Sequence, residues 1–203
     1  MLLPSLRQWA YSIAEDQLIG HVAARRAAPA NVPVPASAPE PASTPVVTIA
    51  VFGDDQLAGY ATNSMGMISS VAPNEPQSLQ ALLQKQFDDT GITVENHATG
   101  GRAASLMNLL DGMDGGGPPL AQRLASTQAS IVIISYGLND VYGGETVSDF
   151  SGYLAQAIQV VRDANRTPIL EEPSPTCDTD HPQLAAYSAA IDSVGKTLGV
   201  PVL

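Results

Sequence analysis

The sequence predicts one α/β domain with a parallel sheet over residues 46–203, and two observations predict this fold class. Strand-length apolar runs alternate along this region with helix-length amphipathic segments. The runs are apolar throughout, as in parallel sheets that helices cover on both faces. A chain of 203 residues has room for one such domain and a tail.

The expected strands and helices follow from local patterns. A β-branched run that ends at Gly53 predicts a strand. Leu79 and Leu83 have helical spacing and would share one helix face. A glycine-rich turn lies at 115–117. In chain order, the expected elements are strand 46–52, helix 78–87, strand 92–96, a short helix around 106–110, strand 131–136, helix 147–164, strand 168–171, helix 182–198 and the start of a fifth strand at 200–203.

The first 45 residues have a different character. Residues 1–27 are predicted to form an amphipathic helical segment, because an apolar stripe along 5–27 includes Trp9 and Ile13. This segment is expected to cover apolar sheet surface of the domain, and a membrane-surface role is the alternative. Residues 28–45 are almost entirely Ala, Pro, Ser and Val, as in a semi-rigid linker. The folded domain is therefore expected over 46–203.

Composition and charge exclude several classes of function. Apolar residues make up 44% of the chain and charged residues 14%, which favours a folded core over general disorder. A net charge of −11 would repel nucleic acid. No apolar run has the length of a membrane-spanning helix, and Glu15 and Asp16 interrupt any signal-peptide core. Cys177 is the single cysteine and cannot form an internal disulfide.

Polar residues and glycines follow the predicted strands. Ligands of parallel sheets bind beyond the carboxyl ends of the strands, so these residues are the candidate site. They are Gly53-Asp54-Asp55, Gly100-Gly101-Arg102, Gly137-Leu138-Asn139-Asp140 and the segment 172–181.

Three of these strand ends resemble, in order and spacing, the sequence blocks of the SGNH/GDSL hydrolases. Residues 53–59 resemble the G-D-S-x-x-x-G block, residues 94–101 the block with the oxyanion glycine, and residues 137–140 the G-x-N-D block. The resemblance covers residues 46–203. It implies a three-layer α/β/α sandwich with a flavodoxin-like parallel sheet, here C-terminally truncated, because the family's last strand and helix do not appear.

The resemblance also implies roles for individual residues. Asp55 stands at the nucleophile position, where the family has serine. The N–H groups of residue 55 and Gly101 and the amide of Asn139 would form the oxyanion hole, and each such donor typically lowers the barrier by roughly 3 to 4 kcal/mol. Asp54 and Asp140 would support the site through backbone and loop hydrogen bonds.

Aspartate at the nucleophile position has three explanations. The domain has lost its esterase chemistry, by evolution or by mutation. Alternatively, Asp55 occupies the oxyanion hole and the protein binds a ligand there. In the third explanation Asp55 is itself the nucleophile, although hydrolysis of the resulting acyl-enzyme would still need an activated water.

The family's catalytic histidine lies in a D-x-x-H block after the fifth strand, which this sequence does not reach. Residues 178–181 match the D-x-x-H pattern in residue types, but they follow the fourth strand. His181 is therefore expected to be a loop residue and not the catalytic base. His21 and His97 are interpreted as structural. Cys177 lies among acidic residues and does not suit a nucleophile.

The functional expectation is an SGNH-type ester hydrolase for small acyl or acetyl esters, impaired or inactive in this chain. The alternative is a non-catalytic binding or interaction domain that uses the remaining oxyanion pocket. No cofactor is expected. A cation held by Asp54, Asp55 and Asp140 is the less favoured reading of those carboxylates. The family and the Ala/Pro linker favour a secreted or periplasmic protein, and the sequence leaves the oligomeric state open.

Overall fold

The computed structural model describes residues 46–62, 67–175 and 183–203. The chain divides into two units, Met1–Val46 and Val47–Leu203. The amphipathic segment 1–27 and the linker 28–45 lie outside the described residues, so their predicted structure remains a prediction.

Four parallel strands form the central sheet in the order β4-β1-β5-β6. Their bounds are β1 Thr48–Gly53, β4 Thr93–Asn96, β5 Ile131–Ser135 and β6 Thr167–Leu170. Because all four run in the same direction, their carboxyl ends lie along one edge of the sheet. The predicted parallel sheet is thereby confirmed.

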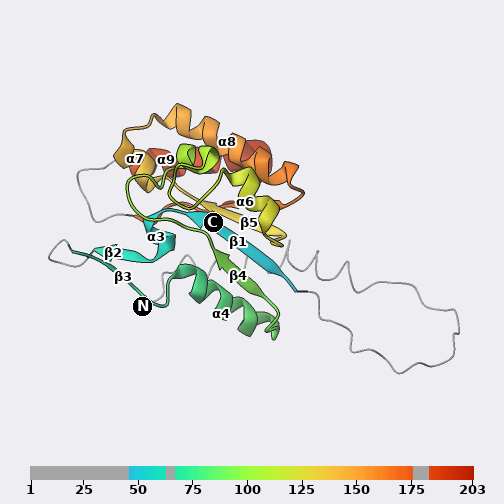
Figure 1. Cartoon of the computed structure of the whole chain (residues 1–203). Coiled ribbons are helices and arrows are strands. Elements are labelled where there is room, and N and C mark those ends of the chain that lie inside the picture. The colour runs from blue at the N-terminus through green and yellow to red at the C-terminus, as the bar shows by residue number, and fades with distance from the viewer. Residues whose placement is uncertain (1–45, 63–66, 176–182) are drawn as a thin grey trace, which may run out of the picture. The chain divides into compact units, whose positions relative to one another are not determined.

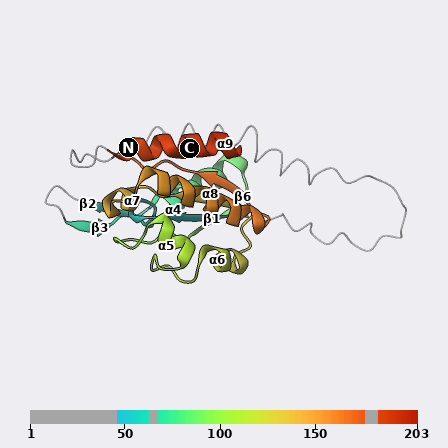
Figure 2. The ribbon, with the colours of Figure 1, turned by 90° about the horizontal axis from the view of Figure 1, so that it is seen from above.

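Helices cover both faces of this sheet (Figure 1). On one side lies α4 Glu75–Phe87. The helices on the other side are α5 Leu106–Asp111, α6 Leu120–Ser126, α7 Leu138–Gly143, α8 Val147–Asp163 and α9 Leu184–Leu198. Figure 2 shows α9, α8 and α5 side by side across the sheet.

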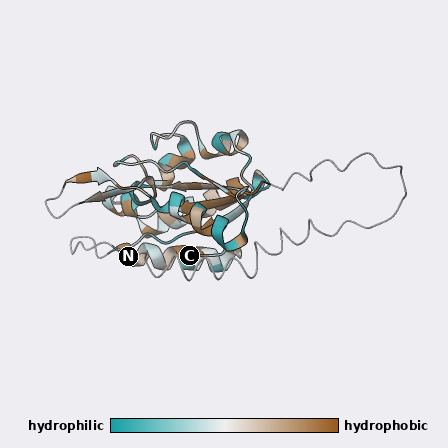
Figure 3. Cartoon of the chain, turned by 90° about the horizontal axis from the view of Figure 1, so that it is seen from below, coloured by the Kyte–Doolittle hydropathy of each residue, from teal (hydrophilic) through white to brown (hydrophobic). Residues whose placement is uncertain are grey.

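Side chains along the buried strands alternate between the two faces of the sheet and form the core on both. All six residues of β1 are buried, with Ala50 and Phe52 facing α5 to α9 and Ile49 and Val51 facing the opposite side. Side chains of α8 and α9, such as Phe150, complete the main cluster. The strands are the most hydrophobic part of the domain (Figure 3), which is why a sequence of apolar runs predicts them.

The structure differs from the predicted elements at a few places. Helix α4 begins at Glu75 rather than at residue 78, because Asn74 and Gln77 form a capping box and Pro76 occupies the first turn. The fifth strand is represented by a single bridge, between Leu170 and Val202. Helices α6 and α7 are short and were not expected.

A two-stranded antiparallel ribbon also escapes the sequence pattern. It consists of β2 Tyr60–Thr62 and β3 Ile68–Ser70, and it follows the short helix α3 Asp55–Ala58. Each element has only three or four residues, which is too few for a periodicity to be recognised.

Candidate functional site

Three residues from separate strand ends meet at the carboxyl edge of the sheet. Asp55 is the first residue of α3, directly after β1. Gly101 lies in the loop after β4, and Asn139 is in the first turn of α7, after β5. Residues that are up to 84 positions apart in the chain therefore come together, because parallel strands end at one edge of the sheet.

The Asp55 carboxylate accepts a hydrogen bond at each of its two oxygens. The Gly101 backbone N–H donates to Oδ1 at 2.9 Å, and the Asn139 side-chain amide donates through Nδ2 to Oδ2 at 2.7 Å. Asn139 is buried, whereas Asp55 is half-buried. The two donors thus converge on the negatively charged end of one side chain.

Glycines permit this convergence. Gly101 has a φ of +91°, in the left-handed region, and this backbone conformation carries its N–H toward residue 55. At Gly100 a Cβ would lie 2.4 Å from the Tyr60 ring and 3.1 Å from Asp55 Oδ1. The loop after β4 can therefore approach Asp55 only because position 100 has no side chain.

Asp54 stabilises the turn between β1 and α3. It caps α3, since its Oδ1 accepts from the Gln56 backbone N–H at 3.2 Å. The side chain is 2% exposed. Burial raises the pKa of Asp54 to about 7, although the Gln56 hydrogen bond opposes that shift and the Asp140 charge adds to it.

Asp140 connects α7 to the start of α5. Its Oδ1 accepts from the Leu106 backbone N–H at the start of α5, at 2.9 Å. Burial raises the pKa of Asp140, although the hydrogen bond from Leu106 opposes that shift. The neighbouring Glu145, which sequence reasoning did not single out, has its pKa raised to about 7 by burial and by the Asp140 charge.

Further residues lie at this edge of the sheet. Ser174 belongs to the candidate segment 172–181, whereas Gln56 and Glu171 were not singled out from sequence. Gln56 exchanges two hydrogen bonds with the backbone of Ser174, one from Nε2 to the carbonyl at 3.1 Å and one from the Ser174 N–H to Oε1 at 3.0 Å. Burial and then the adjacent Glu75 carboxylate raise the pKa of Glu171, at the end of β6. None of these polar residues stands in a distinctive sequence pattern.

The histidines do not join this group within the described part of the chain. His97 interacts with Glu95 through Nε2 at 3.1 Å and stacks on Phe52, at a ring-centroid distance of 5.0 Å. His181, Cys177 and His21 lie outside the described residues. Among residues 46–62, 67–175 and 183–203, no cluster of three or more acidic, histidine or cysteine side chains is arranged to hold a metal ion.

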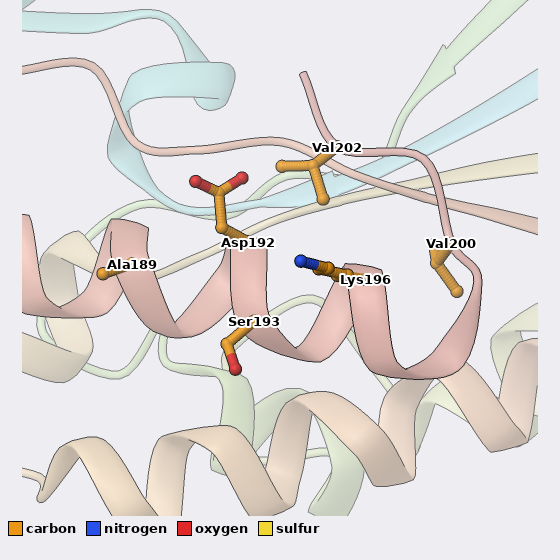
Figure 4. Close-up of a pocket in the computed structure, with 6 residues that line it drawn as sticks. All are labelled: Ala189, Asp192, Ser193, Lys196, Val200 and Val202. Atoms are coloured by element: carbon orange, nitrogen blue, oxygen red, sulfur yellow. The ribbon is translucent and has the colours of Figure 1, made fainter.

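A separate hollow of about 600 Å³ lies at α9 (Figure 4). In that view Asp192 points from the helix toward the segment that carries Val202. The lining residues are Ala189, Asp192, Ser193, Lys196, Val200 and Val202. None of them is a predicted site residue. No helix in the described part of the chain is long and apolar enough to cross a membrane.

The fold and the strand-end residues together define a class of protein. A parallel sheet of this order, with Gly53-Asp54-Asp55 after its first strand and Gly137 to Asp140 after its third in sequence, is the arrangement expected of SGNH-type hydrolases. Residues 51–203 match the GDSL-like Lipase/Acylhydrolase family. The chain belongs to this family.

Solved structures support the same fold. A lipolytic protein of the G-D-S-L family from Desulfitobacterium hafniense aligns with a TM-score of 0.57 and 20% identity, covering 77% of this chain and 76% of that one. The acetylxylan esterase Axe2 from Geobacillus stearothermophilus gives 0.57 and 13%, covering 77% and 75%. The esterase EstA from Pseudoalteromonas gives 0.52 and 17%, with the same coverage. Among curated proteins, no sequence matches this chain.

Proposed function

We propose that this domain is a GDSL-type ester hydrolase that is inactive in this chain, because its own Asp55 carboxylate occupies the oxyanion hole. The observation that carries the proposal is the pair of hydrogen bonds that Gly101 N–H and Asn139 Nδ2 donate to Asp55. In ester hydrolysis the carbonyl oxygen becomes an oxyanion, which needs such preorganised donors. The Asp55 carboxylate carries the same negative charge as that oxyanion and accepts hydrogen bonds from both donors.

This occupancy implies that the chain as it stands does not turn over esters. The donors would have to give up a charge-assisted interaction with Asp55 before they could receive a substrate oxygen. Asp55 as a nucleophile is disfavoured, because both of its oxygens already accept hydrogen bonds and an acyl-enzyme would still need an activated water. The proposed substrate is an ester of a small acyl or acetyl group, as the family resemblance implies.

The alternative function is a binding domain that uses the same donors without catalysis. Occupation by Asp55 is compatible with it, because a ligand with a stronger anionic group could displace the carboxylate. The two functions differ in one respect. A hydrolase descended from active enzymes should recover ester turnover when a hydroxyl and a base are supplied, and a pure binding domain should not.

The test is ester turnover with added imidazole as an external base. We expect no turnover above buffer for the unmodified chain, and measurable hydrolysis of a nitrophenyl acyl ester by Asp55→Ser when imidazole is present. The matched control is Asp111→Ser, an exposed aspartate at the end of α5, measured in the same imidazole. Asn139→Ala in the Asp55→Ser background should lower the rate by about a hundredfold.

Two outcomes would contradict the proposal. Turnover by the unmodified chain would show that the catalytic groups lie elsewhere. Equal rates for Asp55→Ser and Asp111→Ser in imidazole would favour the binding domain. Asp55→Ser without imidazole is not expected to restore turnover, because His97, the histidine among the described residues, interacts with Glu95.

A further inference from the structure

The side chain of Gln56 joins two strand ends that are not neighbours in the sheet. Gln56 follows Asp55 in α3, and its amide exchanges two hydrogen bonds with the backbone of Ser174, at 3.1 and 3.0 Å. Ser174 lies beyond β6, and β5 stands between β1 and β6. Because adjacent strands are about 4.8 Å apart, the segment after β6 extends about 10 Å across the carboxyl edge to reach Gln56.

The segment that Gln56 holds also contacts the start of α7, which carries Asn139. Pro173 is buried, and its Cγ would lie 3.3 Å from a Cβ at Gly137, so the proline ring packs directly on this glycine. Gly137 has a φ of +136° and is the N-cap of α7, two residues before Asn139. The start of α7 therefore rests on the segment after β6.

These contacts form a closed ring at the carboxyl edge of the sheet. The ring runs from α3 across the segment after β6 to the start of α7, and it closes with the hydrogen bond from Asn139 Nδ2 to Asp55 Oδ2 at 2.7 Å. Both the carbonyl oxygen and the NH₂ group of Gln56 take part, which fixes the orientation of its amide. Such a ring suits a site whose donors must be held to within about 0.5 Å.

We infer that Gln56 is a positioning residue of the oxyanion hole, which holds the Asn139 amide toward residue 55 through the segment after β6 and the start of α7. This inference rests on the proposed function, because it takes Asn139 Nδ2 to be an oxyanion donor. Gln56 touches no reacting atom in this role. A purely structural Gln56 would stabilise the fold and leave the position of Asn139 unchanged.

The first measurement needs no turnover. In the unmodified chain, the NMR signals of the Asn139 side-chain amide report its hydrogen bond to Asp55, and Asp55→Ala shows where they lie without that acceptor. We expect Gln56→Met, whose side chain is of similar length and has no amide, to move the signals at least halfway toward that position. Pro173→Ala should move them in the same direction, because it keeps the Gln56 bonds and removes the ring from Gly137.

Gln84→Met is the matched control. Gln84 is also a half-buried amide that bonds to loop backbone, since its Nε2 donates to the Ile92 carbonyl at 2.8 Å and to the Thr90 carbonyl at 3.4 Å. These carbonyls precede β4, at the opposite edge of the sheet from Asp55. The control therefore removes a similar pair of hydrogen bonds and should leave the Asn139 signals in place.

The second measurement uses Asp55→Ser in imidazole. Adding Gln56→Met should lower the maximal rate of nitrophenyl ester hydrolysis by about tenfold, which is less than the loss expected from removing the Asn139 amide itself. The KM should change little, because a misplaced oxyanion donor weakens the transition state more than it weakens substrate binding. Adding Gln84→Met should change neither value.

Several outcomes would overturn the inference and leave the proposed function standing. They are Asn139 signals that stay in place in Gln56→Met, signals that move equally in Gln84→Met, signals that Pro173→Ala leaves unchanged, and a rise in KM at an unchanged maximal rate. Absence of ester turnover by Asp55→Ser in imidazole would overturn the proposed function, and with it the oxyanion role of Gln56, even where the Asn139 signals move as expected.

Discussion

Asp55 is the residue on which the proposed chemistry depends. Its carboxylate accepts hydrogen bonds from the loop after β4 and from helix α7, so the aspartate is part of the hydrogen-bonded structure of the site. A serine hydroxyl at this position would be smaller and uncharged, and the two donors would then be available to another anion. The same substitution that opens the site therefore also removes a structural contact.

The Asn139 side chain provides a test of that contact. Asn139→Asp would place a second carboxylate beside Asp55 in a buried position, and we expect it to lower the free energy of unfolding by more than Asn139→Ala does. Loss of the amide alone should cost about 1 to 3 kcal/mol. Urea unfolding measures the loss in free energy of unfolding for each of the two variants. In the Asp55→Ser background, the loss caused by Asn139→Asp should be smaller. An equal cost in both backgrounds would show that the two side chains are not coupled.

At the scale of elements, a buried ion pair holds the glycine-rich segment 115–117 against α6. Arg123 of α6 binds Asp114 through both terminal nitrogens, and its Nε donates to the Pro118 carbonyl at 2.7 Å. Both side chains are nearly fully buried. A Cβ at Gly116 would clash with Arg123 and with Thr99, so this loop lies close to the loop after β4 that carries Gly101.

Breaking this ion pair should be costly. Removal of one partner leaves the other charge buried and unpaired, so Arg123→Met or Asp114→Asn should each lower the free energy of unfolding by about 3 to 5 kcal/mol. Lys85→Met is the control, because Lys85 is exposed on α4, and it should change stability by less than about 0.5 kcal/mol. Chemical denaturation gives all three values. A cost near that of the control would mean that the loop rearranges and readmits water to the unpaired charge.

At the scale of the whole molecule, the buried carboxyl groups determine how stability depends on pH. The pKa of Asp54 in the folded protein is about 7, above its ordinary value of 3.8. The folded state therefore holds a proton that the unfolded chain has released between these two values. Stability from this group is fully present below about pH 4 and is lost as pH rises through 7. The net charge of −11 acts in the same direction, since self-repulsion grows as carboxyls ionise.

We therefore expect the free energy of unfolding to be larger at pH 5 than at pH 8. Asp54→Asn should reduce that difference, by at most about 3 kcal/mol, because the amide keeps an acceptor for the Gln56 N–H and has no charge to bury. Asp111→Asn should leave the difference unchanged, as this aspartate is exposed. Thermal melts across this pH range measure the effect. A larger stability at pH 8 would show that folding does not raise the pKa of Asp54.

Local patterns were sufficient for the sheet and for much of the candidate site. The strands and the long helices have periodicities that the sequence displays directly, and the residues after each strand had to meet because parallel strands end at one edge. The ribbon of β2 and β3 and the contacts of Gln56 with Ser174 could not be predicted in this way. Each joins a few residues whose relative position depends on loop geometry.

The sequence by itself determined the family, the parallel sheet and the candidate positions 55, 101 and 139, because motif spacing and apolar periodicity are local properties of a chain. Only the tertiary structure decided what Asp55 does there. Its two oxygens accept hydrogen bonds from the loop after β4 and from helix α7, at residues 46 and 84 positions away, and no local sequence pattern extends over that separation. The same folding made Asp54 a buried acid and placed the Tyr60 ring beside Gly100, since burial and contact depend on how separate segments pack.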